Sequence, residues 1–140
     1  MRTETSHISL WLGWARTKRA FDHALKIRYS ESGSSLGSAF GRAFGVRYDE
    51  DLREAMKQNK QAKSLNELLS GISYEAEAIP ALVQAGAQLS PDDNCFICLY
   101  DFRTPTTSRT SWITPDLELR FSVVAKFRRP ATDVGRWMSK

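Results

Sequence analysis

The chain has 140 residues, 41% of them hydrophobic, and a formal net charge of +4. This length and composition predict one globular domain and exclude a disordered chain. No apolar run approaches the ~20 residues that a membrane helix needs, and the polar-flanked N-terminus is not typical of a signal peptide. Only two cysteines occur, so we expect no disulfide framework and a cytoplasmic protein.

The charges are unevenly distributed along the chain. Residues 1–48 contain eight Lys/Arg and three Asp/Glu, residues 49–101 contain four and ten, and residues 102–140 contain eight and three. Nucleic-acid binders usually carry a continuous basic stripe with interleaved aromatic residues. Two basic flanks around an acidic centre instead favour a protein partner with charged patches of its own.

The first third of the chain is predicted to form a strand and two helices. Alternating apolar residues indicate a strand over 7–14. An apolar stripe predicts a helix over 16–29 with Thr17 as its N-cap, and a serine-rich loop follows. Regularly spaced phenylalanines predict a short helix within 35–46 that ends at Gly45, with glycines that let another element pack closely.

The middle of the chain is predicted to be helical. Acids at the start and lysine at the end of residues 49–58 are typical of a helix, because they suit the helix macrodipole. Ser64 and Glu67 form a capping box that opens a second helix. Residues 73–86 are predicted to form a third helix, started or kinked by a proline.

Two strands are predicted toward the end. Residues 94–100 form a short apolar and aromatic strand, and residues 117–127 alternate as a long strand with one wet face. Residues 103–116 are expected to be an exposed connection. The order of elements predicts an α+β fold, a small mainly antiparallel sheet with several helices on one face. We expect a single domain over 1–140, with a weakly ordered tail after residue 130.

No catalytic or metal-binding motif is apparent. Cys95 and Cys98 lie in the apolar strand on opposite faces, which favours core packing over redox or zinc chemistry. His7 and His23 have no neighbouring nucleophile or orienting acid, and the P-loop, GxGxxG and GxSxG patterns are absent. We therefore expect no enzyme, no metal and no cofactor.

The acidic triplet Asp49, Glu50 and Asp51 is the main candidate site. It could simply cap a helix and meet its dipole. It could also form a partner-facing acidic patch, joined by Glu54, Glu75 or Glu77. Metal binding would need converging ligands from elsewhere in the chain, such as the aspartates near residues 92–101.

Two of the four tryptophans are further candidates. Trp11 has the opposite parity to the apolar residues of its strand, so it packs under a helix layer or is partly exposed. Trp112 lies in a polar segment and is a candidate interface residue, because tryptophan is enriched at binding hot spots. The alternative is that Trp112 folds back onto the body of the protein.

The order and spacing of five segments resemble the immunity protein 22 family of bacterial polymorphic-toxin systems. The segments are ISLWLG (8–13), AFDHAL (20–25), SAFGRAFGVRYDEDL (38–52), LLSGISY (68–74) and CFICLYDF (95–102), and the resemblance spans roughly residues 7–102. It implies an α+β, non-enzymatic antidote that binds and neutralises a toxin domain encoded beside it.

The resemblance also suggests which residues meet the toxin. The family's acidic pattern falls on Tyr48 and the acidic triplet, and its strand tryptophan on Trp11. The predicted partner-binding residues are Asp49, Glu50, Asp51, Glu54, Tyr48, Trp11 and Trp112. Many such toxins attack nucleic acid, and acids aimed into a basic cleft would mimic phosphates. The toxin could be blocked at its active site or beside it, and no direct nucleic-acid or membrane contact is expected.

One alternative is a nucleic-acid-binding module. It would use the basic C-terminal segment, with Arg103, Arg109, Arg120, Arg128 and Arg129.

Overall fold

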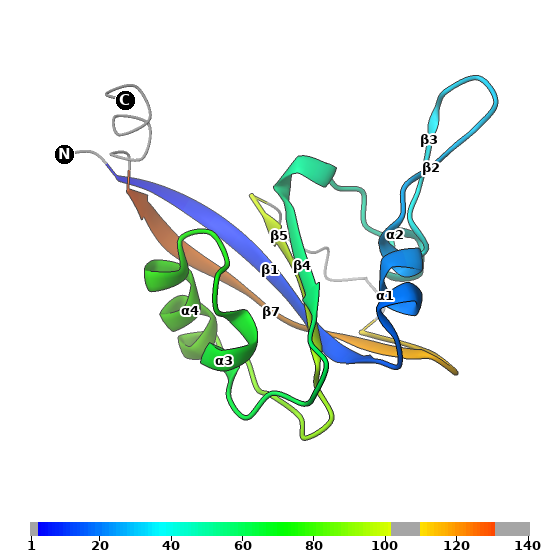
Figure 1. The fold of residues 1–140 in the computed structure, drawn as a ribbon. Helices are drawn as coiled ribbons and strands as arrows, with labels where there is room; N and C mark the ends of the chain where they lie inside the picture. Colours follow the sequence, from blue (N-terminus) through cyan, green and yellow to red (C-terminus); the bar gives the residue numbers. More distant parts are fainter. Residues whose placement is uncertain (1–2, 102–109, 131–140) are drawn as a thin grey trace.

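The computed structural model describes residues 3–101 and 110–130, and Figure 1 shows their arrangement. A five-stranded antiparallel sheet has the strand order β4-β5-β1-β7-β6. Its strands are β1 (Thr3–Ala15), β4 (Arg53–Lys57), β5 (Cys95–Tyr100), β6 (Ser111–Thr114) and β7 (Leu117–Pro130). A two-stranded hairpin, β2 (Arg28–Tyr29) and β3 (Ser35–Gly37), projects from the body. The helices are α1 (Lys18–Leu25), α2 (Ala39–Phe44), α3 (Leu65–Leu69) and α4 (Glu75–Gln84).

Helices cover both faces of the sheet. Successive residues of β5 alternate between two cores, and all six are buried. Leu10, Leu12 and Phe96 join the core under α3 and α4. Trp11 and Ile97 join the core under α1 and α2. The predicted α+β class is confirmed, but the prediction that the helices lie on one face is wrong, because the central strands are apolar on both sides.

A bulge in β7 moves that strand from one core to the other. Leu10 pairs with Val123 and Trp11 pairs with Phe121, which leaves Ser122 as an extra residue. Before the bulge, Leu119 and Phe121 pack with the core under α1 and α2, whereas Val123, Ala125 and Phe127 after it pack with the core under α3 and α4. The predicted strand is confirmed, but its apolar residues do not share one face.

The helix ends follow local sequence rules. Thr17 Oγ1 accepts a hydrogen bond from Ala20 N at 3.1 Å, and Ser64 Oγ accepts one from Glu67 N at 3.1 Å, as predicted for both caps. Gly45 ends α2 in the left-handed conformation with φ 68°. Within α1, the apolar stripe is buried, but the helix stops at Leu25 instead of continuing to residue 29.

The predicted helix over 49–58 is wrong. A single 3-10 turn spans Glu50–Leu52, and the chain then forms strand β4 against β5. Asp49 does act as a cap, because its Oδ1 accepts a hydrogen bond from Asp51 N at 2.9 Å. The acids and lysine satisfy a helix pattern locally, but pairing with the buried strand β5 prevails.

Candidate partner-binding surface

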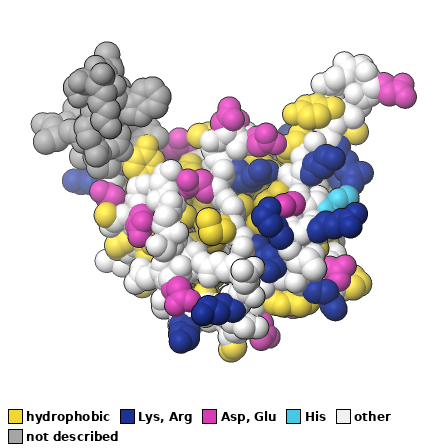
Figure 2. Space-filling view, in the orientation of Figure 1, with side chains coloured by type: hydrophobic (Ala, Val, Ile, Leu, Met, Phe, Trp, Pro, Cys, Tyr) yellow, Lys and Arg dark blue, Asp and Glu magenta, His cyan; other side chains and the backbone are white. Residues whose placement is uncertain are grey.

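The acidic turn, residues 49–52, lies at the start of the edge strand β4. Asp49, Glu50 and Asp51 are all exposed, and none of them forms an ion pair within the described residues. Figure 2 shows acidic side chains over this turn, and Lys and Arg side chains over α1 and the base of the hairpin. The turn therefore presents uncompensated negative charge beside a basic surface.

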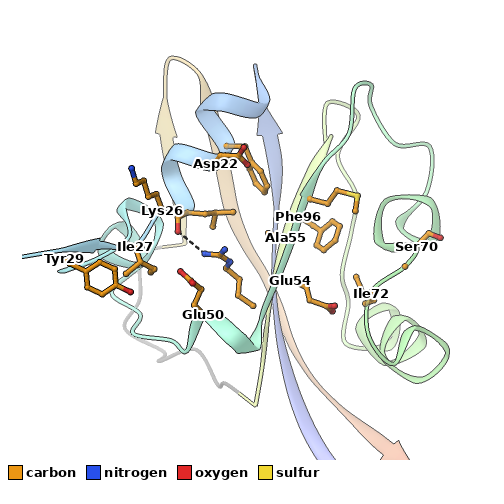
Figure 3. A pocket seen from close by; sticks show the side chains of 15 residues that line it. Asp22, Lys26, Ile27, Tyr29, Glu50, Glu54, Ala55, Ser70, Ile72 and Phe96 are labelled. Carbon is orange, nitrogen blue, oxygen red and sulfur yellow. Dashed lines mark hydrogen bonds between the residues drawn. The ribbon is translucent and has the colours of Figure 1, made fainter. Parts of the chain in front are cut away.

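A groove of about 660 Å³ runs along β4 next to this turn. The helix α1 and the hairpin form one wall, and the loop after α3 forms the other (Figure 3). Apolar and charged side chains mix in its lining. The lining residues are Phe21, Asp22, Leu25, Lys26, Ile27, Tyr29, Glu50, Arg53, Glu54, Ala55, Met56, Ser70, Gly71, Ile72 and Phe96.

Large apolar side chains are exposed in and beside the groove. Met56 is 50% exposed and Tyr29 is 63% exposed. Leu52, in the acidic turn, is 39% exposed. Interfaces are enriched in aromatic residues and methionine at their centres. The groove therefore combines exposed apolar side chains with charge at one end, which suits binding of another polypeptide.

Glu54 has a structural role on the wall of the groove. Its two carboxylate oxygens accept hydrogen bonds from Ser73 N and Ser73 Oγ, both at 2.9 Å. Tyr100 donates to the Ser73 carbonyl at 2.9 Å. Burial and the neighbouring Glu54 carboxylate raise the pKa of Tyr100. Glu54 thus fixes the loop after α3 to β4, and its carboxylate is largely occupied within the chain.

Two of the aromatic residues predicted to bind a partner have contacts within the chain instead. Trp11 is fully buried, in edge-to-face contact with Phe40 at 5.0 Å and with Phe121 at 5.2 Å between ring centroids. The prediction that Trp11 binds a partner is corrected, because its side chain has no exposed surface. Tyr48 is half-buried and its hydroxyl lies 2.8 Å from Ser38 Oγ, which anchors the segment before the acidic turn to the start of α2.

Trp112 lies far from the acidic turn across the sheet. It belongs to β6, whereas the acidic turn leads into β4, and these strands are opposite edges of the sheet. Trp112 is half-buried against the core under α1 and α2. The expectation that it lies in an exposed connection is wrong, and it does not share one surface with the acidic triplet. The segment 102–109 lies outside the described residues.

The described residues contain no group of three His, Cys, Asp or Glu side chains that could hold a metal ion. Both cysteines are buried, as the alternation predicts, and desolvation raises the pKa of Cys95 to about 12 and that of Cys98 further. Because their pKa values are raised, the cysteine thiols are poorly suited to nucleophilic chemistry.

His23 is exposed, and its Nε2 atom lies 3.2 Å from a guanidinium nitrogen of Arg28.

Of the predicted basic cluster near the C-terminus, only Arg120 and Arg128 have described side chains. Arg120 donates to Asp93 Oδ1 at 2.8 Å and also pairs with the other carboxylate oxygen. Asp93 is buried, so this ion pair fixes the turn before β5 to β7. Arg128 is exposed, whereas Arg103 and Arg109 lie outside the described residues and the side chain of Arg129 is not described.

Comparison with known families decides the classification. The family model described as immunity protein 22 matches residues 8–127. The chain belongs to the immunity protein 22 family. The match confirms the resemblance seen in the sequence and extends it beyond residue 102, through β6 and most of β7. Neither the curated proteins nor the solved structures gave a significant match.

Membership defines the role in outline: the chain is an immunity protein, and its partner is a toxin protein. No helix in residues 3–101 and 110–130 is long and apolar enough to cross a membrane. Sequence reasoning found the acidic turn of this immunity protein but missed the groove beside it. The segment Arg53–Lys57 shows no strict alternation of apolar and polar residues, so little in its own sequence indicates the edge strand.

Proposed function

We propose that this immunity protein neutralises its toxin by binding, without catalysis, and that the acidic turn and the adjoining groove form the contact surface. The support is the exposure of Asp49, Glu50 and Asp51 without ion-pair partners in the described chain, next to a groove with exposed apolar side chains. Charge of this kind steers association with a basic partner and is effective over about 8 Å at physiological salt.

The proposed toxin acts on nucleic acid. The active-site cleft of such a toxin must attract phosphates and is therefore basic, so three adjacent carboxylates can occupy the place of the substrate backbone. Binding then blocks the toxin's active site or its substrate path. The basic surface over α1 lies beside the acidic turn and is suited to acidic parts of the same toxin (Figure 2).

A charge-reversal variant tests this proposal. Glu50→Lys with Asp51→Lys keeps the Asp49 cap and reverses two exposed charges. We expect the association rate with the toxin domain encoded by the adjacent gene to fall roughly tenfold or more at low salt, and growth rescue in co-expression to weaken.

The matched control changes the net charge equally at a distance from the groove. Asp92→Lys with Glu118→Lys alters two exposed acids outside the groove lining, one before β5 and one in β7. This control should bind the toxin nearly as fast as the unaltered chain. If both variants lost the same fraction of the association rate, only the net charge of the chain would matter. If Glu50→Lys with Asp51→Lys lost none of it, the acidic turn would not be part of the interface.

A further inference from the structure

We infer that the edge strand β4 binds an extended segment of the toxin by backbone pairing, so that the sheet gains a sixth strand in the complex. This inference rests on the proposed function, because it specifies how the groove engages the toxin. β4 pairs with β5 on one side only, and its other side faces the groove. Addition of a strand to an exposed sheet edge is a general mode of peptide recognition.

The backbone of β4 has hydrogen-bonding groups directed into the groove. Gln58 N donates to Asn94 O at 2.7 Å. Because backbone groups alternate in direction along a strand of an antiparallel pair, the N–H and C=O groups of Met56 and Glu54 also point toward β5. Ala55 and Lys57 then direct their N–H and C=O groups outward. Arg53 N confirms this alternation, because it donates to Glu50 O in the acidic turn and not to β5. Within the described residues, no backbone partner covers Ala55 or Lys57 on that side.

The walls of the groove fit the alternating side chains of a strand. On one face of the sheet Ala55 packs against the core that includes Phe21 and Leu25 of α1. On the other face Met56 pairs across the strands with Phe96, which shares a core with Ile72; Figure 3 labels Ala55, Phe96 and Ile72. A strand laid along β4 would direct successive side chains into these two apolar sites in turn. The occupant is therefore an extended segment with apolar side chains facing both walls.

The charged residues of β4 do not obstruct this edge. Lysine and other charges commonly protect exposed edges against pairing. Here Arg53 donates to the Leu25 carbonyl at 2.9 Å, Lys57 donates to the Gln58 carbonyl at 2.9 Å, and Glu54 is held by Ser73. The acidic turn at the start of β4 adds a requirement, because the segment should carry a Lys or Arg at that end.

A proline substitution tests the pairing. Ala55→Pro removes one outward N–H and leaves the hydrogen bonds from β4 to β5 intact. We expect affinity for the toxin domain encoded by the adjacent gene to fall roughly tenfold. The matched control is Ile113→Pro in the opposite edge strand β6, where Phe121 N donates to Thr110 O and the same alternation directs the Ile113 N–H outward. Circular dichroism and thermal unfolding establish that both variants are folded.

Amide hydrogen exchange gives a second measurement that needs no variant. In the complex of the unaltered chain with that toxin domain, the Ala55 and Lys57 amides should exchange at least tenfold more slowly than in the free chain, whereas the Ile113 amide should not change. Saturated binding without protection of Ala55 and Lys57 would overturn the pairing and leave the proposed function standing. Failure of the unaltered chain to bind would overturn both. Protection in the isolated chain at higher concentration would show self-association and also contradict the assignment.

Discussion

At the scale of single residues, Gly13 shows how closely the two long strands approach. A Cβ atom on Gly13 of β1 would lie 1.9 Å from the Glu118 carbonyl oxygen of β7. Because the obstacle is backbone, it cannot move aside as the end of a flexible side chain can. The position therefore admits glycine alone without displacement of β7, which is paired with β1 along nearly its whole length.

We predict that Gly13→Ala lowers the free energy of unfolding by roughly 2–3 kcal/mol, as overpacking of a close contact does. Urea denaturation followed by circular dichroism measures this loss. Gly33→Ala is the comparison, because Gly33 has φ 88° but open space around it. The comparison variant should lose only about 1 kcal/mol. A smaller loss at Gly13 than at Gly33 would contradict the close approach of the two strands.

At the scale of elements, β5 is the strand on which both cores depend. Its residues alternate between the core under α1 and α2 and the core under α3 and α4. Cys95 and Cys98 therefore face opposite cores, and neither is exposed. A thiol in such a place stays protonated, because an ionised thiolate would be buried without water.

We predict that neither cysteine reacts with iodoacetamide in the folded chain at pH 8, and that both react in urea. Mass spectrometry of the alkylated protein measures the difference. The raised pKa of Cys95, about 12 against 9.0 for a free thiol, has a consequence for stability. The stability that comes from keeping the Cys95 thiol protonated is fully present below pH 9. It is lost as the pH rises from about 9 to 12, because in that range the thiol ionises in the unfolded chain but not in the folded chain. Rapid alkylation under folding conditions would contradict the burial of β5.

At the scale of the whole molecule, one sheet joins two cores. Phe44 of α2 is buried in one core and Leu82 of α4 in the other. The cores share β1, β5 and β7, so loss of packing on one face removes support for strands that the other face also needs. This arrangement predicts that the described chain unfolds as one cooperative unit.

We predict that Phe44→Ala and Leu82→Ala each cost roughly 3–5 kcal/mol and that each variant still unfolds in a single transition. Calorimetry tests this by comparing the measured enthalpy with the van't Hoff enthalpy. Two separate transitions in either variant would show that the two sides fold independently. The expected single domain would then be wrong.

Local features of the fold were predictable from the sequence, whereas features that depend on distant pairing were not. The caps at Thr17 and Ser64 and the helix end at Gly45 follow from residues within one turn of each site. The strand β4 does not, because its acids and lysine also satisfy a helix pattern and only contact with β5 decides between them. The strands of the hairpin also depend on pairing, because residues 28–29 and 35–37 fall at the ends of predicted helices and only the tip falls in the predicted loop.

The candidate site also has one part that is local in the sequence and one part that depends on distant segments. The acidic turn is one continuous stretch, and Asp49 was correctly interpreted as a cap. The groove beside it is assembled from α1, β4, the loop after α3 and Phe96 of β5. No spacing in the sequence relates these segments. Trp11 and Trp112 are candidates because of their residue type. Residue type alone does not reveal that Trp11 is fully buried, or that Trp112 lies in the edge strand opposite β4.

The extra residue Ser122 makes the interior of this protein sensitive to chain length at one point. If Ser122 were deleted, the side chains on one side of the deletion would move to the opposite face of the sheet. A row of apolar side chains would then be exposed and polar ones would be buried. The hairpin tip between β2 and β3 carries no such constraint, because it projects away from the sheet. We therefore expect insertions and deletions among members of the family to occur at the hairpin tip and to be absent around the bulge in β7.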